Sequence, residues 1–448
     1  PGASPSRSEP ARRSPAVRRP GAPRAQSEER PPIFWRHYHA TINGPAPSSF
    51  STLVTHAREE PTARISHSVH GGEAMPALSR RSFVTLTALA SSSILLSPRA
   101  FAGSGATSAA GKPQETFLDF NESPYGPSAK ARAAMQRAAA LCGRYDYDAQ
   151  DALVGLFAKQ NGIPAECVHA YCGSRQPLQY AVAAFTGKER RLVMADPSYD
   201  SVVGAAQVQG AKVAAVPLDA EAAHDIERML AAAQRDAGLI YICNPNNPTG
   251  TLTPHERIVR AIERKPERSV VLVDEAYIHF SDAPSVVGLA IQRQDVLVLR
   301  TFSKLYGMAG ARLGLAIGHP QLLARLERFG GHNVVPSPTA HAGLESLRDD
   351  DLVPRRKQQN AEVRERTIAW LRQQGFRCTA SQSNCFMVDM RRPAELVIAE
   401  LEKQRVHVGR PWASWPNWVR VTVGSEEEMQ AFRSAFASVS RRHQVAMR

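Results

Sequence analysis

Six short apolar runs, separated by stretches of helical periodicity, most constrain the fold of this chain. The runs cover residues 191–195, 212–216, 239–243, 270–274, 296–300 and 312–317. Apolar runs of this length that alternate with amphipathic helices are typical of a mostly parallel sheet covered by helices on both faces. We therefore expect an α/β fold, with a large domain over residues 145–335.

The chain of 448 residues is long enough for a second domain. Gly330-Gly331 and the prolines at 336 and 338 interrupt the pattern, so we expect residues 336–448 to form a smaller α+β domain. Residues 103–144 should form an extended arm followed by an alanine-rich helix. Further predicted elements are the arm at 115–127, helices at 128–141 and 355–374, strands at 384–390, 405–409 and 418–423, and a capped last helix that begins at Ser425.

Polar side chains follow several of the apolar runs. An Asn-Pro-Asn-Asn-Pro-Thr-Gly segment at 244–250 comes directly after one run, and an Asp-Glu-Ala-Tyr segment ends the next. The carboxyl ends of parallel strands meet at the crevice where open α/β sheets bind ligands, so we expect these side chains to lie together. They are Asn247, Asp274, Tyr277, Thr301, Ser303, Lys304 and Arg312.

Lys304 has Ser303 before it and Arg312 eight residues later. An amine close to a hydroxyl and a guanidinium is the arrangement that holds an aldehyde cofactor with a phosphate group. The amine forms a Schiff base, while the hydroxyl and guanidinium bind the phosphate. A lysine in a turn is otherwise a solvated surface residue, but the two upstream segments favour the cofactor interpretation.

Together, these three motifs resemble those of fold-type I pyridoxal-phosphate aminotransferases, and most of all the histidinol-phosphate aminotransferases. The resemblance covers about residues 115–440. It implies pyridoxal 5'-phosphate as the cofactor, with a small-molecule amino donor and a 2-oxo acid acceptor. It also implies that Asp274 faces the ring nitrogen, that Asn247 and Tyr277 bind the phenolic oxygen, and that Lys304 is the catalytic base and acid. Asp274 and Glu275 could instead cap a helix.

Other cofactor contacts are implied by the same resemblance. Gly173, Ser174 and Arg175 open a helix, whose first N–H groups form an anion site. The family usually has an acidic residue where Arg175 stands, so Arg175 either adds a phosphate contact or is a solvated cap residue. Tyr199 matches the aromatic residue that stacks on the cofactor ring, or is a half-buried tyrosine after a turn. Tyr145 matches the tyrosine that reaches the neighbouring subunit's phosphate site, which implies a homodimer with shared active sites.

Four residues match substrate-binding positions of the family. Arg420 matches the arginine for the substrate carboxylate, and Arg410 matches one that helps bind the phosphate of histidinol phosphate or is a solvated surface residue. Asn121 and Tyr125 belong to an N-terminal segment that folds over the substrate.

Three tryptophans lie near these arginines. We expect Trp412, Trp415 and Trp418 to pack within the small domain; if they lined the pocket, they would favour an aromatic or bulky substrate side chain.

Three function classes follow from these motifs. The first is an aminotransferase that acts on histidinol phosphate or on an amino acid or related amine, with an aromatic side chain as one option. The second is a pyridoxal-phosphate decarboxylase or lyase on the same scaffold, as in threonine-phosphate decarboxylases. The third is a binding protein that has lost activity, which the full set of catalytic residues disfavours.

Charge and cysteine content exclude other classes. The formal net charge is +13, but residues 1–74 alone contain ten arginines against six acidic residues, and the body has no basic run. We therefore expect no nucleic-acid partner. The six cysteines have no metal-ligand spacing, and most sit in apolar runs, so we expect buried free thiols and no metal.

The N-terminal region predicts export. Residues 1–74 are rich in proline and arginine without periodicity, which indicates disorder, and we interpret them as the product of a start site placed upstream of Met75. Residues 75–102 contain Arg80-Arg81, an apolar stretch and a small-residue cleavage site, the three parts of a twin-arginine signal. The enzyme should then be periplasmic. The stretch could instead be an uncleaved anchor or a chance apolar helix, and the enzyme stays cytoplasmic if the signal is not functional.

Overall fold

The computed structural model describes residues 115–330 and 334–446, the side chains of residues 441–446 excepted. The expected disordered segment 1–74, the expected signal 75–102 and the start of the expected arm lie outside the described residues. Within the described ranges, no helix combines the length and hydropathy needed to cross a bilayer.

A seven-stranded sheet forms the centre of the large domain, in the order β2-β8-β7-β6-β5-β3-β4. The strands from β7 to β4 in this order run parallel, whereas β8 pairs antiparallel with both β7 and β2, so the expected mostly parallel sheet is confirmed. The strands are β2 (Val168–Tyr171), β3 (Arg191–Asp196), β4 (Val213–Pro217), β5 (Ala237–Cys243), β6 (Val270–Asp274), β7 (Val296–Thr301) and β8 (Gly314–Ile317).

The strand register brings the functional strand ends to one edge of the sheet. Cys243, the last residue of β5, pairs with Asp274, the last residue of β6. Because β8 runs in the opposite direction, its first residue, Gly314, pairs with Thr301 at the end of β7. Arg312 therefore reaches the carboxyl ends of the parallel strands from the amino end of β8.

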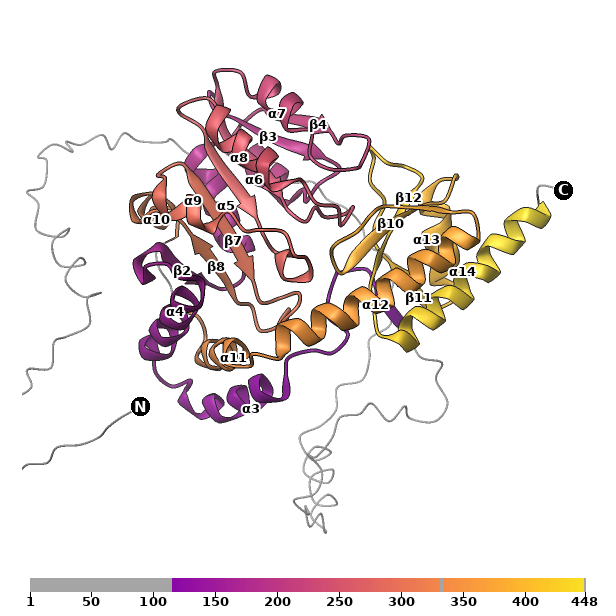
Figure 1. Cartoon of the computed structure of the whole chain (residues 1–448), viewed down its shortest axis with the longest axis horizontal. Coiled ribbons are helices and arrows are strands. Elements are labelled where there is room, and N and C mark those ends of the chain that lie inside the picture. The colour runs from indigo at the N-terminus through magenta and orange to yellow at the C-terminus, as the bar shows by residue number, and fades with distance from the viewer. Residues whose placement is uncertain (1–114, 331–333, 447–448) are drawn as a thin grey trace, which may run out of the picture. The chain divides into compact units, whose positions relative to one another are not determined.

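Helices cover both faces of this sheet (Figure 1). Successive residues of a strand point to opposite faces, so Ile240 and Val271 belong to one buried cluster, and Leu239 and Leu272 to the other. Helices α4, α7, α8, α9 and α11 contribute to the first cluster, and α5, α6 and α10 to the second. Their bounds are α4 (Tyr147–Asn161), α5 (Arg175–Phe185), α6 (Ser201–Val208), α7 (Ile226–Ala233), α8 (His255–Arg264), α9 (Val287–Gln292), α10 (Pro320–Glu327) and α11 (Ser337–Leu347).

A third buried cluster forms the core of the small α+β domain. It contains the antiparallel sheet β12-β10-β9 and a parallel pair of β1 with β11. The elements are β1 (Thr116–Leu118), α12 (Leu352–Gln373), β9 (Arg377–Cys378), β10 (Cys385–Asp389), α13 (Ala394–Glu402), β11 (Val406–Val408), β12 (Trp418–Thr422) and α14 (Glu426–Ala446).

The division between the two cores differs from the expected boundaries. Residues 337–347 form α11, which packs against α3 (Ala129–Ala138) and α4, and Leu347 and Leu352 belong to a large-domain cluster. Leu118, expected in the arm, belongs to the small-domain core because β1 pairs with β11. The described residues on both sides of the expected break therefore belong to the large domain, and the small domain begins inside α12.

Side-chain hydrogen bonds cap the first turns of α3 and α14. Ser128 accepts from the N–H of Ala131 at the start of α3, which ends three residues before the expected limit and continues as the 3₁₀ turn η1 (Ala139–Leu141). At the start of α14, Ser425 Oγ accepts from the N–H of Glu428, and Glu428 Oε2 accepts from the N–H of Ser425 at 2.7 Å. This reciprocal pair is the expected capping box. The other short turns are η2 (Ala165–Cys167) and η3 (Ile278–Phe280).

Candidate active site

A cavity of about 720 Å³ lies at the edge of the sheet where β5, β6 and β7 end. The sheet edge, the arm before α3 and the small domain all contribute to its walls, represented by Asp274, Phe120 and Arg420. The predicted site residues that line the cavity are Ser174, Arg175, Tyr199, Asn247, Asp274, Tyr277, Thr301, Ser303, Lys304, Arg312, Arg410 and Arg420.

Asp274 places a buried carboxylate at one side of the cavity. Tyr241 on β5 donates to its Oδ2 at 3.0 Å, and the N–H of Ala276 donates to its Oδ1 at 3.1 Å. Burial nevertheless raises the pKa of Asp274 to about 6. A cation placed against this carboxylate would stabilise its charged form, so the site suits a protonated nitrogen of a ligand.

Lys304 projects its amine into the same cavity. Its Nζ donates to the carbonyl oxygen of Phe120 at 3.0 Å and lies 5.7 Å from the ring centroid of Tyr277. Burial, followed by the positive charge of Arg420, lowers the pKa of Lys304 to about 8. More of this amine is therefore uncharged near neutral pH than in a solvated lysine, as a nucleophile or base requires.

An anion-binding cradle lies where α5 begins. Arg312 donates to Ser303 Oγ at 3.3 Å and to the carbonyl of Ala309 at 2.9 Å. Gly173 has a φ of +87°, and a Cβ there would lie 2.8 Å from Arg312 Cζ, so only glycine lets the guanidinium approach. Ser174 and the first N–H groups of α5 complete a site suited to a phosphate group.

Arg175 stands at the first residue of α5, beside this cradle. Its side chain is exposed and lines the cavity. This position is compatible with a contact to a bound phosphate.

Arg420 presents a buried guanidinium without a carboxylate partner among the described residues. Its Nη1 donates to Asn247 Oδ1 at 2.9 Å, and its Nη2 donates to the carbonyl of Asp119. Nearby, Asn121 Nδ2 donates to Tyr277 Oη at 3.1 Å, which docks the arm on the site. A buried arginine with only neutral acceptors is suited to bind the carboxylate of a ligand.

The three tryptophans lie in different surroundings near Arg410, which lines what we call the outer end of the cavity. Trp412 lines the cavity, and the guanidinium of Arg410 lies 4.2 Å from its ring centroid. Trp415 and Trp418 contact each other with tilted rings whose centroids are 4.8 Å apart, and they do not line the cavity. Trp412 is buried against Arg410 and Arg420 of the small domain, as expected, and it also lines the cavity, which was the alternative.

Other predicted residues lie outside the cavity lining. Gly173 lies beneath Arg312, and Asn121 reaches the site through Tyr277. Tyr125 lines a separate small recess, and Tyr145 is 84% exposed.

Several lining residues had no recognised sequence signal. They come from the arm, the start of α6, the end of β5 and the small domain, and they are Asp119, Phe120, Glu122, Asp200, Cys243 and Val408. Tyr241 also went unpredicted. A tyrosine within a fully apolar strand needs a buried hydrogen-bond partner, and that need was the only signal available.

A family model described as aminotransferase class I and II matches residues 116–436. The chain belongs to this family. An aromatic amino acid aminotransferase of Mycobacterium avium is 34% identical over 324 residues, 71% of this chain and 90% of that protein. A histidinol-phosphate aminotransferase of Symbiobacterium thermophilum is 35% identical over 321 residues, 71% of this chain and 88% of that protein. The solved structure of histidinol-phosphate aminotransferase from Sinorhizobium meliloti with pyridoxal-5'-phosphate has a TM-score of 0.69 at 25% identity, covering 73% of this chain and 91% of that chain.

The protein is therefore a pyridoxal-phosphate-dependent aminotransferase, as the three motifs predicted. Its own residues fit this cofactor. Gly173 leaves room for the guanidinium of Arg312 at the phosphate cradle, and Asp274 and Lys304 offer a carboxylate for the ring nitrogen and an amine for the aldehyde. Among the described residues, no group of three or more His, Cys, Asp or Glu side chains is arranged to hold a metal ion.

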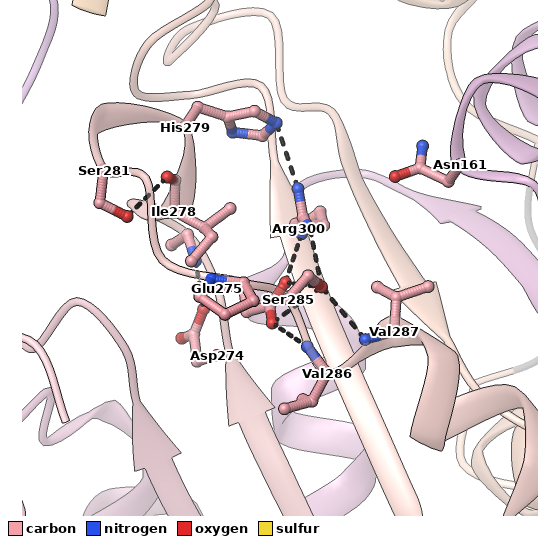
Figure 2. A network of polar contacts seen from close by, with 12 residues as sticks. Asn161, Asp274, Glu275, Ile278, His279, Ser281, Ser285, Val286, Val287 and Arg300 are labelled. Carbon is pink, nitrogen blue, oxygen red and sulfur yellow. Dashed lines mark hydrogen bonds and ion pairs between the residues drawn. The ribbon is translucent and has the colours of Figure 1, made fainter. Parts of the chain in front are cut away.

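A buried ion pair between Arg300 and Glu275 lies next to Asp274 in this aminotransferase (Figure 2). Arg300 Nε donates to Glu275 Oε2 at 2.7 Å, with side chains 8% and 2% exposed. Ser285 Oγ donates to Glu275 and accepts from Arg300 Nη2 at 3.0 Å. Since Glu275 follows Asp274 and Arg300 lies four residues before Lys304, the pair ties the end of β6 to the end of β7.

Proposed function

We propose that this aminotransferase transfers the amino group of an aromatic amino acid to a 2-oxo acid. The Mycobacterium avium relative is named for aromatic amino acids and the Symbiobacterium thermophilum relative for histidinol phosphate. Their identities to this chain, 34% and 35%, do not separate the two substrates. The side chains at the outer end of the cavity do favour one of them.

The observation that carries the proposal is the pairing of Arg410. Arg410 Nη2 donates to Asp200 Oδ2, and both residues line the cavity. The two side chains of this pair are 50% and 54% exposed, and the carboxylate offsets part of the charge that Arg410 could offer to a substrate phosphate. Trp412 in the wall and Phe120, which is 70% exposed, add aromatic surface. Both candidate substrates have an aromatic side chain, and the phosphate of histidinol phosphate lies on the arm that replaces the α-carboxylate of an amino acid. A carboxylate needs only Arg420, whereas a phosphate dianion would also need Arg410, which Asp200 engages, so an aromatic amino acid fits this cavity better.

Pyridoxal phosphate, when bound, supplies an electron-accepting ring that makes the Cα–H bond of the amino acid acidic. The roles proposed for the chain follow from where its groups lie. Arg420 would orient the substrate carboxylate through a bidentate pair. Lys304 Nζ would take the proton from Cα and return it at the end of the transfer. Asp274 would keep the ring nitrogen protonated, because an adjacent carboxylate favours the cation.

The remaining cofactor contacts are proposed from the same cavity. Ser303 and Arg312 would bind the phosphate, together with the start of α5. Asn247 and Tyr277 would donate hydrogen bonds to the phenolic oxygen, and Tyr199 would cover a face of the ring. Tyr199 is half-buried and lines the cavity, which supports that role.

We also propose that the enzyme is a homodimer with shared active sites. Among the described residues, six of the nine large apolar or aromatic side chains that are exposed lie within residues 117–147. They are Phe117, Phe120, Tyr125, Leu141, Tyr145 and Tyr147. A second copy that covers this segment would bury them. Tyr145, which is far from the cavity of its own chain, is our candidate for the contact to the partner's cofactor.

Export remains a proposal based on the sequence. Arg80-Arg81, the apolar stretch that follows and the small residues at 100–102 support a twin-arginine signal, which would place the enzyme in the periplasm.

The substrate proposal is tested by steady-state kinetics. Purified protein with pyridoxal phosphate and 2-oxoglutarate is given phenylalanine, tyrosine or histidinol phosphate, and the glutamate formed is measured. We expect kcat/KM for an aromatic amino acid to exceed that for histidinol phosphate by about tenfold or more. Faster reaction of histidinol phosphate would refute the proposal, and carbon dioxide without glutamate would indicate a decarboxylase.

A further inference from the structure

We infer that Asp200 is a specificity residue that keeps phosphorylated substrates out of the cavity. This inference rests on the proposed function and names the residue that enforces it. Asp200 occupies the N-cap position of α6, yet its side chain makes no capping hydrogen bond. An aspartate at this position usually accepts from the first N–H groups of the helix. Here the carboxylate turns into the cavity and pairs with Arg410.

Further contacts hold this pair in place. Ser414 Oγ of the small domain donates to Asp196 Oδ1, at the end of β3, at 2.9 Å. Arg410 Nη1 donates to the carbonyl of Pro411 at 3.1 Å, and its guanidinium stacks on Trp412. The guanidinium is thus oriented toward Asp200 by its neighbours on both sides. It cannot bind a substrate phosphate without sharing or leaving the carboxylate.

The other charges that line the cavity do not offer a replacement. Arg175 and Arg312 lie at the cradle for the cofactor phosphate, and Arg420 supplies only one positive charge, either to the carboxylate of an amino acid or to the phosphate that replaces it in histidinol phosphate. Lys304 is needed as an uncharged amine. Asp119 and Glu122 on the arm add further negative charge. A substrate phosphate, with about two negative charges near neutral pH, would therefore find one cation without a carboxylate partner, Arg420, and a second, Arg410, whose charge Asp200 offsets.

The inference is tested with Asp200→Asn, which keeps the side-chain shape and removes the charge. Histidinol phosphate and histidinol differ only in the phosphate, so the ratio of their rate constants isolates its effect. Each rate is measured as a single turnover, from the absorbance change of the cofactor in the holoenzyme. Asp196→Asn is the matched control, because it weakens the same domain contact without lining the cavity.

We expect Asp200→Asn to raise the ratio of histidinol phosphate to histidinol by about tenfold or more, and Asp196→Asn to leave it unchanged. Adding Arg410→Gln to Asp200→Asn should return the ratio to its wild-type value, because the increase depends on the guanidinium of Arg410 that Asp200→Asn frees. An unchanged ratio in Asp200→Asn, or an equal change in Asp196→Asn, would overturn the inference. The proposed function is tested separately, by the wild-type preference between phenylalanine and histidinol phosphate. A failure of the inference about Asp200 can therefore be told apart from a failure of the proposed function.

Discussion

Lys304 and Arg420 show how two cations in one buried cavity control each other. Arg420 is held by neutral oxygens of Asn247 and Asp119, so its charge is not cancelled before a ligand binds. That charge acts on Lys304 and adds to the effect of burial in lowering the pKa of the amine. The cation that we assign to the substrate carboxylate therefore also prepares the amine for proton transfer.

The first prediction concerns the pH dependence of cofactor attachment. Only the uncharged amine attacks an aldehyde, and the pKa of Lys304 is lowered to about 8. The rate at which apoprotein reacts with pyridoxal phosphate should therefore rise with pH through a midpoint near that value and then level off. Arg420→Gln removes the neighbouring positive charge, so the pKa and the midpoint should move to higher pH.

Stopped-flow absorbance of apoprotein mixed with pyridoxal phosphate measures this midpoint. Arg410→Gln is the matched control, because Asp200 already pairs with Arg410 and this arginine is not a cause of the Lys304 shift. The proposed coupling fails if Arg420→Gln and wild type share one midpoint.

The sequence could locate the residues at strand ends because strand direction alone decides where they lie. Asn247, Asp274 and Lys304 follow runs whose parallel pairing sends them to one edge. Asp200 and Trp412 could not be assigned in this way. Their positions depend on how the small domain packs on the large one, through contacts between residues more than two hundred positions apart. Local pattern contains no information on that packing.

At the scale of elements, β6 and β7 are joined by more than backbone pairing. Glu275, Ser285 and Arg300 form a satisfied buried network, and His279 Nε2 lies 3.3 Å from Arg300 Nη1. Burial and then Arg300 lower the pKa of His279 to about 3, so this ring is neutral and can accept the hydrogen bond. The network fixes the two strand ends that carry Asp274 and Lys304.

The second prediction is that breaking this pair is costly. Arg300→Met leaves the buried Glu275 carboxylate uncompensated and should lower the free energy of unfolding by about 3–5 kcal/mol. Arg293→Met, which removes the half-exposed pair with Asp295 just before β7, should cost about 1 kcal/mol or less. Thermal denaturation of the two variant apoproteins measures the loss of stability in each. Equal losses would show that the buried pair stabilises the fold no more than the half-exposed pair does.

The elements also show where a local pattern gives the wrong boundary. Pro336 precedes a helix and Pro338 lies in its first turn, but this helix, α11, belongs to the large domain and not to the small one. Most side chains of α11 are buried, because α3 and α4 cover it. Which of two domains an apolar helix joins depends on long-range packing, and turn residues between helices do not reveal it.

At the scale of the whole molecule, the exposed aromatic residues of the arm and of the start of α4 support assembly with a second copy. The third prediction is that the purified enzyme has twice the mass of the chain in light scattering. A mixture of Lys304→Ala and Tyr145→Ala chains, refolded together, should recover up to about a quarter of wild-type activity, because mixed dimers contain one intact shared site. A monomer with full activity would contradict the dimer proposal.

The fourth prediction concerns export of the whole molecule. A chain that starts at Met75 and carries a reporter should cross the inner membrane, and Arg80→Lys with Arg81→Lys should retain it in the cytoplasm. Fractionation of cells that express each version measures this. Retention of the unchanged chain would rule out the signal, and a peptide from residues 1–74 in native protein would rule out the start at Met75.

The central claim is that one edge of the sheet assembles a pyridoxal-phosphate site around Lys304. Borohydride reduction of the holoenzyme, followed by mass spectrometry of its peptides, tests this most directly, because reduction makes the bond between cofactor and lysine permanent. We expect one modified peptide, which contains Lys304, and none in Lys304→Ala, which should also fail to transaminate. A cofactor adduct on a different lysine, or the same adduct pattern in Lys304→Ala, would contradict it.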